Sequence, residues 1–459
     1  MKATGCTLNE QALTQLRGRM RGAVLTPNDD EYDAARQIWN AMIDRRPGVI
    51  ARCTGPEDVR TAIAFAREND LAISIRAGGH NIAGLALCND GLTIDLSLMK
   101  QVTVDSAAAT ANAQAGLTWG EFDRETQQFG LATTGGAVST TGIAGLTLGG
   151  GLGWLMGRYG YTVDNLLSAQ VVLHDGRSVT ASESEHPDLF WALRGGGGNF
   201  GVVTSFQYTL HPVGPVWAGL VAHPIDRLVP MLRFYREFVS TAADELTVHA
   251  AVMTLPTGDK VAAMLPVWSG DPSEGERRVA ALRTFGTPII DSIQQMPYVA
   301  AQSMLDGAVP YGRHNYWKSS FLRDLDDAAI AAIDEHVRRI TSPYSLCLIE
   351  HVHGAPTRRP VDATAFGVRD EHFHFIAIAS WDPVDDSDRH IQWARTFWKA
   401  MQAWSANRVY MNILSADEGD RVAEAYGSNY TRLAQVKATF DPQNVFRNNH
   451  NIPPAGSLA

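Results

Sequence analysis

The stretch Arg76-Ala77-Gly78-Gly79-His80-Asn81 is the most informative part of this sequence. Two glycines, which let backbone amides approach a ligand closely, stand directly before a histidine, whose imidazole is a nucleophile. The apolar residues 71–75 precede the stretch and are typical of a β-strand. A histidine at the end of a strand and next to glycines can carry a covalently bound cofactor.

A second glycine-rich stretch spans residues 133–153 and ends in Gly149-Gly150-Gly151-Leu152-Gly153. Repeated glycines form concave nests of amide donors that replace water around an anion. We expect residues 76–81 and 139–147 to hold a pyrophosphate in this way. The second stretch lacks the strand-Gly-x-Gly-x-x-Gly-helix context of a dinucleotide fold, and the sequence has no Gly-Lys-Ser/Thr phosphate loop, so a nicotinamide cofactor is not supported.

The composition is that of an ordinary globular protein. The chain has 459 residues, 45% hydrophobic and 19% charged, which suits two or three domains. A formal net charge of −10 and the lack of a Lys/Arg-rich run argue against nucleic acid, whose binding depends on neutralised phosphates. No apolar run reaches signal-peptide length or the roughly 18 to 20 residues that span a bilayer. We expect a cytoplasmic protein with neither a nucleic-acid nor a membrane partner.

The first part of the chain alternates between strand and helix patterns up to residue 210. Capping boxes at Thr54–Glu57 and Thr118–Glu121 predict two helix starts, and His174-Asp175-Gly176 predicts a hairpin turn. The expected strands are 71–75, 92–96, 102–104, 109–114, 167–173, 177–181 and 202–210, and the expected helices include 59–68 and 187–193.

After Pro212 and Pro215 the pattern changes to longer strands separated by helices or hairpins, which predicts a mostly antiparallel sheet backed by helices. The expected strands are 246–253, 261–268, 316–322, 345–352, 373–381 and 409–413. The expected helices are 228–238, 274–283, 298–304, 325–340, 389–404 and 430–439, the last followed by a turn over 441–446.

Taken in order, the motifs from about Tyr32 to Pro454 resemble the berberine-bridge-enzyme branch of the FAD-linked oxidases, which have the vanillyl-alcohol-oxidase, or PCMH-type, fold. The motifs that carry the resemblance are Arg76–Asn81, Gly149–Gly153, Tyr159-Gly160-Tyr161-Thr162-Val163-Asp164-Asn165, the segment 193–203, the segment 441–446 and Asn449-His450-Asn451-Ile452-Pro453-Pro454. The resemblance implies an α+β protein with a two-part FAD-binding domain, 1–212 and 411–459, around an inserted substrate domain, 213–410.

The resemblance also implies FAD bound covalently, through the 8α methyl carbon of the flavin, to His80. Many relatives add a second bond from a cysteine, but the matching position here is Val138, so we predict a single attachment. The expected cofactor-binding residues are His80, Arg76, Ala77, Gly78, Gly79, Asn81, Ser139, Thr140, Gly142, Ile143, Gly145, Thr147, Gly149, Gly150, Gly153, Val203, Asn412, Asn449 and Asn451.

Glu350 is the first candidate catalytic residue. It lies in the expected strand 345–352, where Leu348, Glu350 and Val352 share one face. The resemblance places that face toward the cofactor. A carboxylate enclosed beside an apolar ring can act as a base or bind a cationic amine. The alternative is a buried acid paired with an arginine such as Arg369.

Tyr410 and Asn412 are the other catalytic candidates, because Tyr410-Met411-Asn412 resembles the family's Tyr-x-Asn segment beside the flavin. Many members carry a further tyrosine that acts as a base one residue later, where this chain has Ile413, so a tyrosinate mechanism at that position is not expected. A packing role for Tyr410 is the alternative. Asn412, Asn449 and Asn451 are expected to hydrogen-bond the flavin or the substrate.

Metal binding is a rival hypothesis for the pairs His351/His353 and His372/His374, which could gather four imidazoles on adjacent strands. Buried or partly exposed strand histidines are the more common outcome, and we predict no metal site. The four cysteines, Cys6, Cys53, Cys88 and Cys347, are far apart and predict neither disulfides nor a zinc site, with Cys88 expected to pack. Lys318 could carry a cation to the substrate pocket or be solvated.

These features predict an FAD-dependent oxidase that takes hydride from a C–H bond of an alcohol, an amine or a natural-product intermediate and reduces molecular oxygen to hydrogen peroxide. The expected partners are a small-molecule substrate and oxygen, and a homodimer is compatible with the sequence. One alternative is a flavin dehydrogenase or a flavin-dependent oxygenating enzyme of secondary metabolism, with residues 140–143 controlling oxygen access. Another is a metal-dependent or sugar-binding β protein without flavin.

Overall fold

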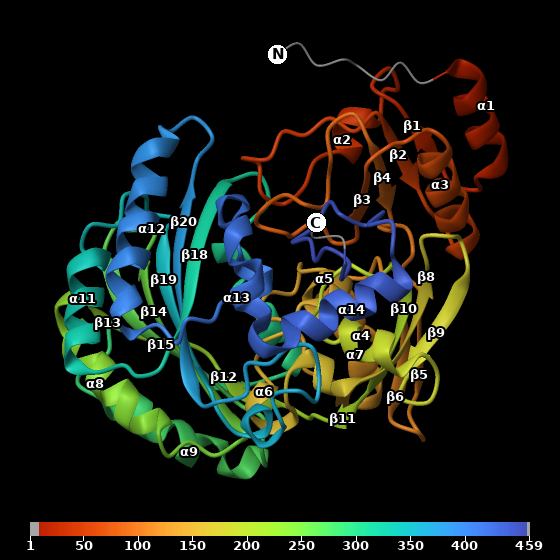
Figure 1. The fold of residues 1–459 in the computed structure, drawn as a ribbon. Helices are drawn as coiled ribbons and strands as arrows, with labels where there is room; N and C mark the ends of the chain where they lie inside the picture. The colour runs from red at the N-terminus through yellow and green to blue at the C-terminus, as the bar shows by residue number, and fades with distance from the viewer. Residues whose placement is uncertain (1–8, 457–459) are drawn as a thin grey trace.

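The computed structural model describes residues 9–456, which form an α+β fold, as expected. Figure 1 shows the N-terminal half of the chain on one side and a large sheet backed by helices on the other, with the C-terminal segment between them. Among the described residues no helix combines the length and apolar character needed to cross a membrane. The division of the chain into domains at residues 212 and 410 stays a prediction.

The described part of the N-terminal half contains two larger sheets and a two-stranded sheet formed by β7 and β11. In the first, with strand order β1-β2-β4-β3, the strands β2, β4 and β3 run parallel; the second is antiparallel, with the order β5-β6-β10-β8-β9. The elements here are α1 (Glu10–Arg19), β1 (Val24–Leu25), α2 (Tyr32–Ala35), β2 (Val49–Arg52), α3 (Pro56–Glu68), β3 (Ile73–Arg76), β4 (Leu92–Asp95), β5 (Val102–Asp105), β6 (Thr110–Gln114), α4 (Trp119–Thr126), β7 (Leu131–Ala132), α5 (Ile143–Leu148), α6 (Met156–Tyr159), β8 (Leu166–Val172), β9 (Ser178–Ser182), α7 (Pro187–Leu193), β10 (Val202–Thr209) and β11 (His211–Pro212).

Two expected capping boxes have different outcomes. At α4, Thr118 and Glu121 form the expected reciprocal bonds. At α3 the expected box is wrong, because Pro56 takes the first helical position and makes Gly55 the N-cap. Asp58, in the first turn of the helix, takes the place of Glu57 as the partner of Thr54. Its carboxylate accepts hydrogen bonds from the backbone nitrogen and the hydroxyl of Thr54 at 2.9 and 2.8 Å.

The central part of the chain forms a large antiparallel sheet with the order β16-β13-β15-β14-β19-β20-β18; β12 is added at β15, and β17 pairs with β12. Its elements are β12 (Val216–Ala218), β13 (Val221–Pro224), α8 (Leu228–Val239), β14 (Leu246–Thr254), β15 (Lys260–Trp268), α9 (Pro272–Thr284), β16 (Ile290–Asp291), β17 (Gln294–Met296), α10 (Tyr298–Gln302), η4 (Asp306–Ala308), β18 (His314–Leu322), α11 (Asp327–Val337), β19 (Leu346–Val352), β20 (His372–Trp381) and α12 (Ser387–Met401).

The two faces of this sheet bury different side chains. On β19, Cys347 and Ile349 join the core formed with α8, α11 and α12, whereas Leu346 and Leu348 join a second core on the opposite face. This follows from the alternation of side chains along a strand. The helices cover the outer face in Figure 1, so the face that carries Leu346, Leu348 and Glu350 is turned toward the rest of the molecule.

The expected strand 409–413 is wrong. Tyr410 is extended, but residues Met411–Ile413 form a 3-10 turn, η7, which is followed by η8 (Ala416–Arg421), α13 (Val422–Tyr426) and α14 (Tyr430–Phe440). The alternation of Val409, Met411 and Ile413 suggested a strand. Instead, the side chains of Tyr410 and Asn412 bond to the glycine-rich stretch at residues 146–152, and the segment lies against that stretch without joining a sheet.

A buried ion pair fastens the C-terminal tail. The ammonium group of Lys437 in α14 donates to Asp441 Oδ2 at 2.6 Å, to the Asn199 carbonyl at 2.7 Å and to the Phe446 carbonyl at 3.0 Å. Neither side chain of the pair is exposed. The tail beyond residue 446 is thereby held against the loop that contains Asn199.

Candidate active site

A cavity of about 360 Å³ lies where the N-terminal half, the inner face of the large sheet and the C-terminal segment meet. Residues within the segments 77–82, 141–148 and 197–203 supply one side, and Leu346, Leu348 and Glu350 of β19 supply another. Residues within the segments 410–413 and 446–450 complete the lining. The cavity therefore joins all the segments in which the sequence placed candidate site residues.

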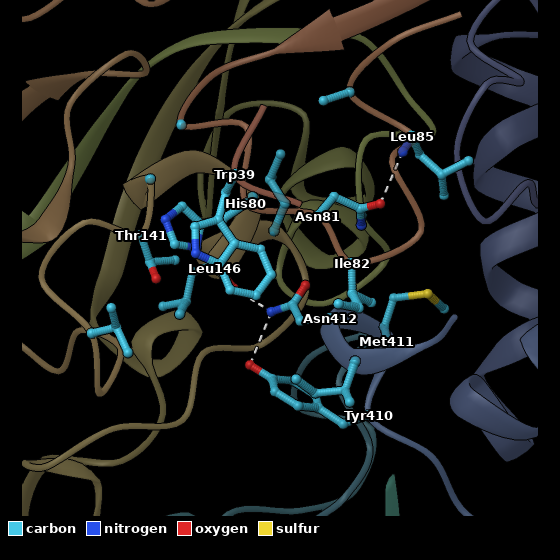
Figure 2. A pocket seen from close by; sticks show the side chains of 18 of the residues that line it. Trp39, His80, Asn81, Ile82, Leu85, Thr141, Leu146, Tyr410, Met411 and Asn412 are labelled. Carbon is cyan, nitrogen blue, oxygen red and sulfur yellow. Dashed lines mark hydrogen bonds between the residues drawn. The ribbon is translucent and has the colours of Figure 1, made fainter. Parts of the chain in front are cut away.

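His80 lines this cavity beside the ring of Trp39 (Figure 2). Its ring stacks on Trp39 with the ring centroids 5.0 Å apart, and Tyr311 contacts it edge-on at 5.5 Å. The His80 Nε2 lies 3.1 Å from the hydroxyl of Thr140. Burial lowers the pKa of His80 to about 4, so its imidazole is neutral at neutral pH and keeps a nucleophilic lone pair.

The two glycine-rich stretches touch through their backbones. A Cβ atom added to Gly78 would lie 2.5 Å from the Gly142 Cα, and Gly79 has a φ of +67°, a left-handed conformation that favours glycine. Glycine is therefore required for the two loops to meet beside His80. The contact leaves their amides close to the cavity, as expected for an anion-binding cradle.

The structure brings most of the predicted site residues to the cavity, and it places others in the layer behind it. Those that line the cavity are Ala77, Gly78, Gly79, His80, Asn81, Gly142, Gly145, Val203, Glu350, Tyr410, Asn412 and Asn449. Those placed elsewhere are Arg76, Ser139, Thr140, Ile143, Thr147, Gly149, Gly150, Gly153 and Asn451. The assignment of each to FAD stays a prediction.

The residues behind the lining have packing and bonding partners of their own. Arg76 donates to the Ala35 carbonyl, and Ser139 donates its hydroxyl to Asp306 at 2.6 Å. Gly149 leaves room for the side chain of Asn412, since an added Cβ would lie 2.0 Å from its Oδ1. The glycines of this stretch thus also serve the docking of the C-terminal segment.

Glu350 carries a charge into the cavity. His374 Nδ1 donates to Glu350 Oε2 at 2.7 Å, and His249 Nδ1 lies 3.5 Å from Oε1. Burial raises the pKa of Glu350, but the hydrogen bond from His374 and the nearby histidines outweigh it, so the pKa is lowered. The expected alternative partner was wrong, because Arg369 pairs with Asp164 at 2.7 and 2.9 Å.

Tyr410 uses its phenol oxygen to hold neighbouring backbone. The oxygen accepts hydrogen bonds from the backbone nitrogens of Gly151 at 3.1 Å and Leu152 at 3.3 Å. It also accepts one from Asn412 Nδ2 at 2.9 Å, which Figure 2 shows. Burial raises the pKa of Tyr410 to about 12, so the phenol is protonated at neutral pH. These contacts favour a role in positioning the loop over one as a base.

The four strand histidines do not converge. His351 and His353 stack on each other with centroids 4.9 Å apart, and His351 packs on Phe373 of the outer core. His374, by contrast, pairs with Glu350 on the inner face. Within residues 9–456 no group of three or more His, Cys, Asp or Glu side chains could hold a metal ion. The idea that these imidazoles gather around a metal is therefore wrong.

Lys318 is neither in the cavity nor solvated, contrary to both expectations. It is only 4% exposed and its ammonium lies 3.1 Å from both Asp417 Oδ1 and Glu418 Oε2. Its neighbour Trp317 points to the other face of β18 and lines the cavity. The lysine therefore fastens η8 to the large sheet.

Several buried polar atoms around the tail fit a bound polar group. Among the described residues, the phenol of Tyr426, Asn449 Oδ1 and His450 Nε2 are buried without a hydrogen-bond partner, and all three residues line the cavity. Buried polar atoms are normally satisfied, so these positions suit a ligand that carries donors and acceptors. Tyr426 and Trp39 were not found from the sequence, because isolated aromatic residues gave no motif. His450 lay within a quoted motif without a role of its own, and His374 was considered only as a metal ligand.

Comparison with known proteins agrees with this geometry. A family model described as FAD binding domain matches residues 47–182, and one described as berberine and berberine-like matches residues 409–453. An FAD-linked oxidoreductase of Dictyostelium discoideum is 31% identical over 97% of this chain and 97% of its own. The (R)-6-hydroxynicotine oxidase of Paenarthrobacter nicotinovorans is 32% identical over 95% of this chain and 98% of its own.

Solved structures share the whole fold. The 6-hydroxy-D-nicotine oxidase of Arthrobacter nicotinovorans superposes with a TM-score of 0.87 at 30% identity, covering 98% of this chain and 99% of that one. A berberine-bridge-enzyme-like protein of Physcomitrella patens, at 24% identity and a TM-score of 0.85, covers 94% of this chain and 97% of its own. The PCMH-type fold is thus confirmed, and the hypothesis of a protein without flavin loses its basis. The chain belongs to the berberine-bridge-enzyme-like family of FAD-linked oxidoreductases.

Proposed function

We propose that this protein is an oxidase that takes hydride from a C–H bond of an alcohol, an amine or a natural-product intermediate and passes the electrons to molecular oxygen, with release of hydrogen peroxide. The observation that carries the proposal is the cavity in which His80 and the glycine loops meet the ionised Glu350 on the inner face of the large sheet. The relatives named as nicotine oxidases support the choice of an oxidase.

The proposal includes FAD attached covalently, and only once, through His80. The neutral imidazole at the cavity edge is suited to this bond. Val138 lines the cavity where relatives with a second bond carry cysteine, whereas the described cysteines, Cys53, Cys88 and Cys347, are buried elsewhere. Cys6 lies outside the described residues. The amides of residues 77–81 and 142–145 would hold the pyrophosphate, and Asn412, Asn449 and the tail would contact the remaining polar edges of the cofactor.

When bound, FAD supplies the hydride acceptor; the residues around it prepare the substrate. Apolar side chains such as Leu348, Ile376 and Ile378 line the inner face and exclude water from the cavity. Glu350 accepts a proton from an alcohol or amine, or binds an ammonium group, through its carboxylate. Tyr410 and Asn412 keep the loop at residues 151–152 in place beside the substrate.

We further propose oxygen as the acceptor in the cell, a role in secondary metabolism, and a cytoplasmic location. The assignment to oxygen follows from the oxidases among the relatives. The metabolic role follows from the mainly apolar cavity, which suits a natural-product intermediate better than a simple sugar.

Two measurements test the proposal. Acid precipitation of the purified protein should leave a yellow pellet, because the flavin stays attached. A panel of amines, sugars and secondary alcohols should then include substrates that release hydrogen peroxide in air. A reduced enzyme that air reoxidises slowly, but that a quinone or dye reoxidises fast, would show a dehydrogenase instead.

A further inference from the structure

The two ring nitrogens of His80 have different surroundings. Nε2 lies 3.1 Å from Thr140 Oγ1, whereas Nδ1 has no hydrogen-bond partner among the described residues. Thr140 itself is outside the cavity lining, and its hydroxyl makes no other hydrogen bond within residues 9–456. The Thr140 hydroxyl is therefore directed at one specific atom of the imidazole.

The ring is also fixed in its plane. Trp39 stacks on it at an interplanar angle of 15°, and Tyr311 meets it at 88°. Each of these aromatic residues is anchored in turn: Trp39 Nε1 donates to the Val309 carbonyl at 2.8 Å, and the Tyr311 hydroxyl donates to the Gly78 carbonyl at 3.2 Å. With the plane fixed, the contact with Thr140 determines which nitrogen faces away from the threonine.

We propose that Thr140 is a positioning residue for the attachment of FAD to His80, an inference that rests on the covalent bond proposed above. Thr140 Oγ1 accepts a hydrogen bond from the Nε2–H group, which fixes the tautomer and leaves the lone pair of the imidazole on Nδ1. Nδ1 is then the atom that bonds to the flavin. The low pKa of His80 is consistent with this, because a neutral ring has a lone pair to offer.

Attachment is a two-electron oxidation in which FAD is the first electron acceptor and oxygen the final one. An N–C bond forms between Nδ1 and the 8α methyl carbon, one C–H bond of that methyl group breaks, and its electron pair passes into the isoalloxazine ring of FAD. The protons released from the methyl carbon and from Nε2 match the two electrons that the ring takes up. Oxygen, the acceptor of the proposed oxidase, then reoxidises the ring. While the imidazole carries positive charge, Thr140 Oγ1 accepts a charge-assisted hydrogen bond from Nε2–H.

The test compares Thr140→Val, which keeps the shape of the side chain but removes the hydroxyl, with Thr140→Ser, which keeps the hydroxyl. Protein produced under riboflavin limitation is mixed with FAD, and samples are precipitated with acid over time. The readouts are the flavin fluorescence of the pellet and the mass of the peptide that contains His80. We expect Thr140→Ser to attach FAD at the wild-type rate and Thr140→Val to do so about tenfold more slowly, the worth of one hydrogen bond to a charged group. Thr140→Ala replaces the valine variant if that variant does not fold.

A variant without the imidazole separates positioning from general packing. In a His80→Ala background FAD can bind only without the covalent bond, and Thr140 has lost its partner. We expect any change that Thr140→Val makes in the FAD dissociation constant in that background to be much smaller than the tenfold loss of attachment rate. A loss of affinity there as large as the loss of rate, or attachment in Thr140→Val as fast as in the wild type, overturns the role of Thr140. A wild-type pellet without flavin overturns the covalent bond itself, which is the proposed function and not only this inference.

Discussion

Glu350 is an ionised side chain in a cavity with mainly apolar walls, and two buried imidazoles keep it ionised. The hydrogen bond from His374 stabilises the carboxylate form, which burial alone would disfavour. A charge maintained in this way favours a functional role over a structural ion pair, since no arginine or lysine among the described residues pairs with it.

The first prediction concerns Glu350→Gln, which keeps the size of the side chain and removes its charge. We expect kcat/KM for the substrate found in the peroxide screen to fall by about 10²- to 10⁴-fold, the usual loss when a general base is removed. Steady-state kinetics measures this. Glu371→Gln is the control, because Glu371 bonds to His351 on the outer face. If Glu350→Gln and Glu371→Gln have the same kcat/KM, Glu350 has no part in the mechanism.

Tyr410→Phe tests the positioning role of the phenol. The substitution leaves the backbone amides of Gly151 and Leu152 without their acceptor. Each unpaired buried donor costs about 1 to 3 kcal/mol, so the free energy of unfolding should fall by a few kcal/mol. Thermal or urea unfolding measures it, with Tyr344→Phe on the exposed surface as the control. If Tyr410→Phe is as stable as the wild type, the positioning role is contradicted, and a role of Tyr410 as a base is the one that remains.

At the scale of elements, α14 and the tail that follows it close one side of the cavity. The ammonium of Lys437 holds three acceptors from the end of the helix, the loop at Asn199 and residue 446. Burial lowers the pKa of Lys437, while its hydrogen bond to Asp441 acts in the opposite direction. The position of Asn449 and His450 in the cavity depends on this buried contact.

Lys437→Met should therefore destabilise the protein strongly, because it leaves the Asp441 carboxylate buried and unpaired. A loss of about 3 to 5 kcal/mol in the free energy of unfolding is expected, the usual result when one partner of a buried pair is removed. The double variant Lys437→Met with Asp441→Asn should recover part of the loss. Urea unfolding of the three proteins checks this, and a double variant no more stable than the single one would contradict it.

The sequence predicted those elements whose signals are local. Helix α7 has the expected bounds, and the hairpin β8–β9 turns where His174-Asp175-Gly176 placed it. Segment 409–413 shows the limit: its apolar alternation suits a strand, but contacts of Tyr410 and Asn412 with residues far away in the chain decide its conformation. Tertiary contacts outweigh local pattern there.

The same holds for the candidate site: residues in local patterns could be predicted from the sequence, and their long-range partners could not. The motif around His80 predicted its place on the cavity, and the alternation along β19, combined with the family resemblance, predicted that of Glu350. The partners of Glu350 could not be predicted, because His249 and His374 come from separate strands whose register depends on the whole sheet. Residues that act through long-range contacts leave no local signal.

At the scale of the whole molecule, buried neutral histidines make stability depend on pH. Burial lowers the pKa values of His351 and His372 to about 3, well below the value of an unfolded chain. Between pH 6.5 and about 3 the unfolded state binds more protons than the folded state, so stability is complete above pH 6.5 and is lost as the pH falls.

We expect the free energy of unfolding to decrease below pH 6.5 by up to about 1.4 kcal/mol per pH unit for each such histidine. Urea unfolding at a series of pH values between 7 and 4 measures the slope. His351→Asn should make the slope shallower. A slope that is the same in His351→Asn and the wild type would contradict the assignment.

The cavity is lined by segments from residue 39 to residue 450, so the wall at 446–450 leaves the ribosome long after the His80 loop. A chain that is still being translated already contains the His80 loop, but it lacks the side of the cavity that residues 446–450 provide. Capture of the cofactor must therefore follow translation of that wall, and truncation just before it should yield a colourless protein even though the histidine is intact.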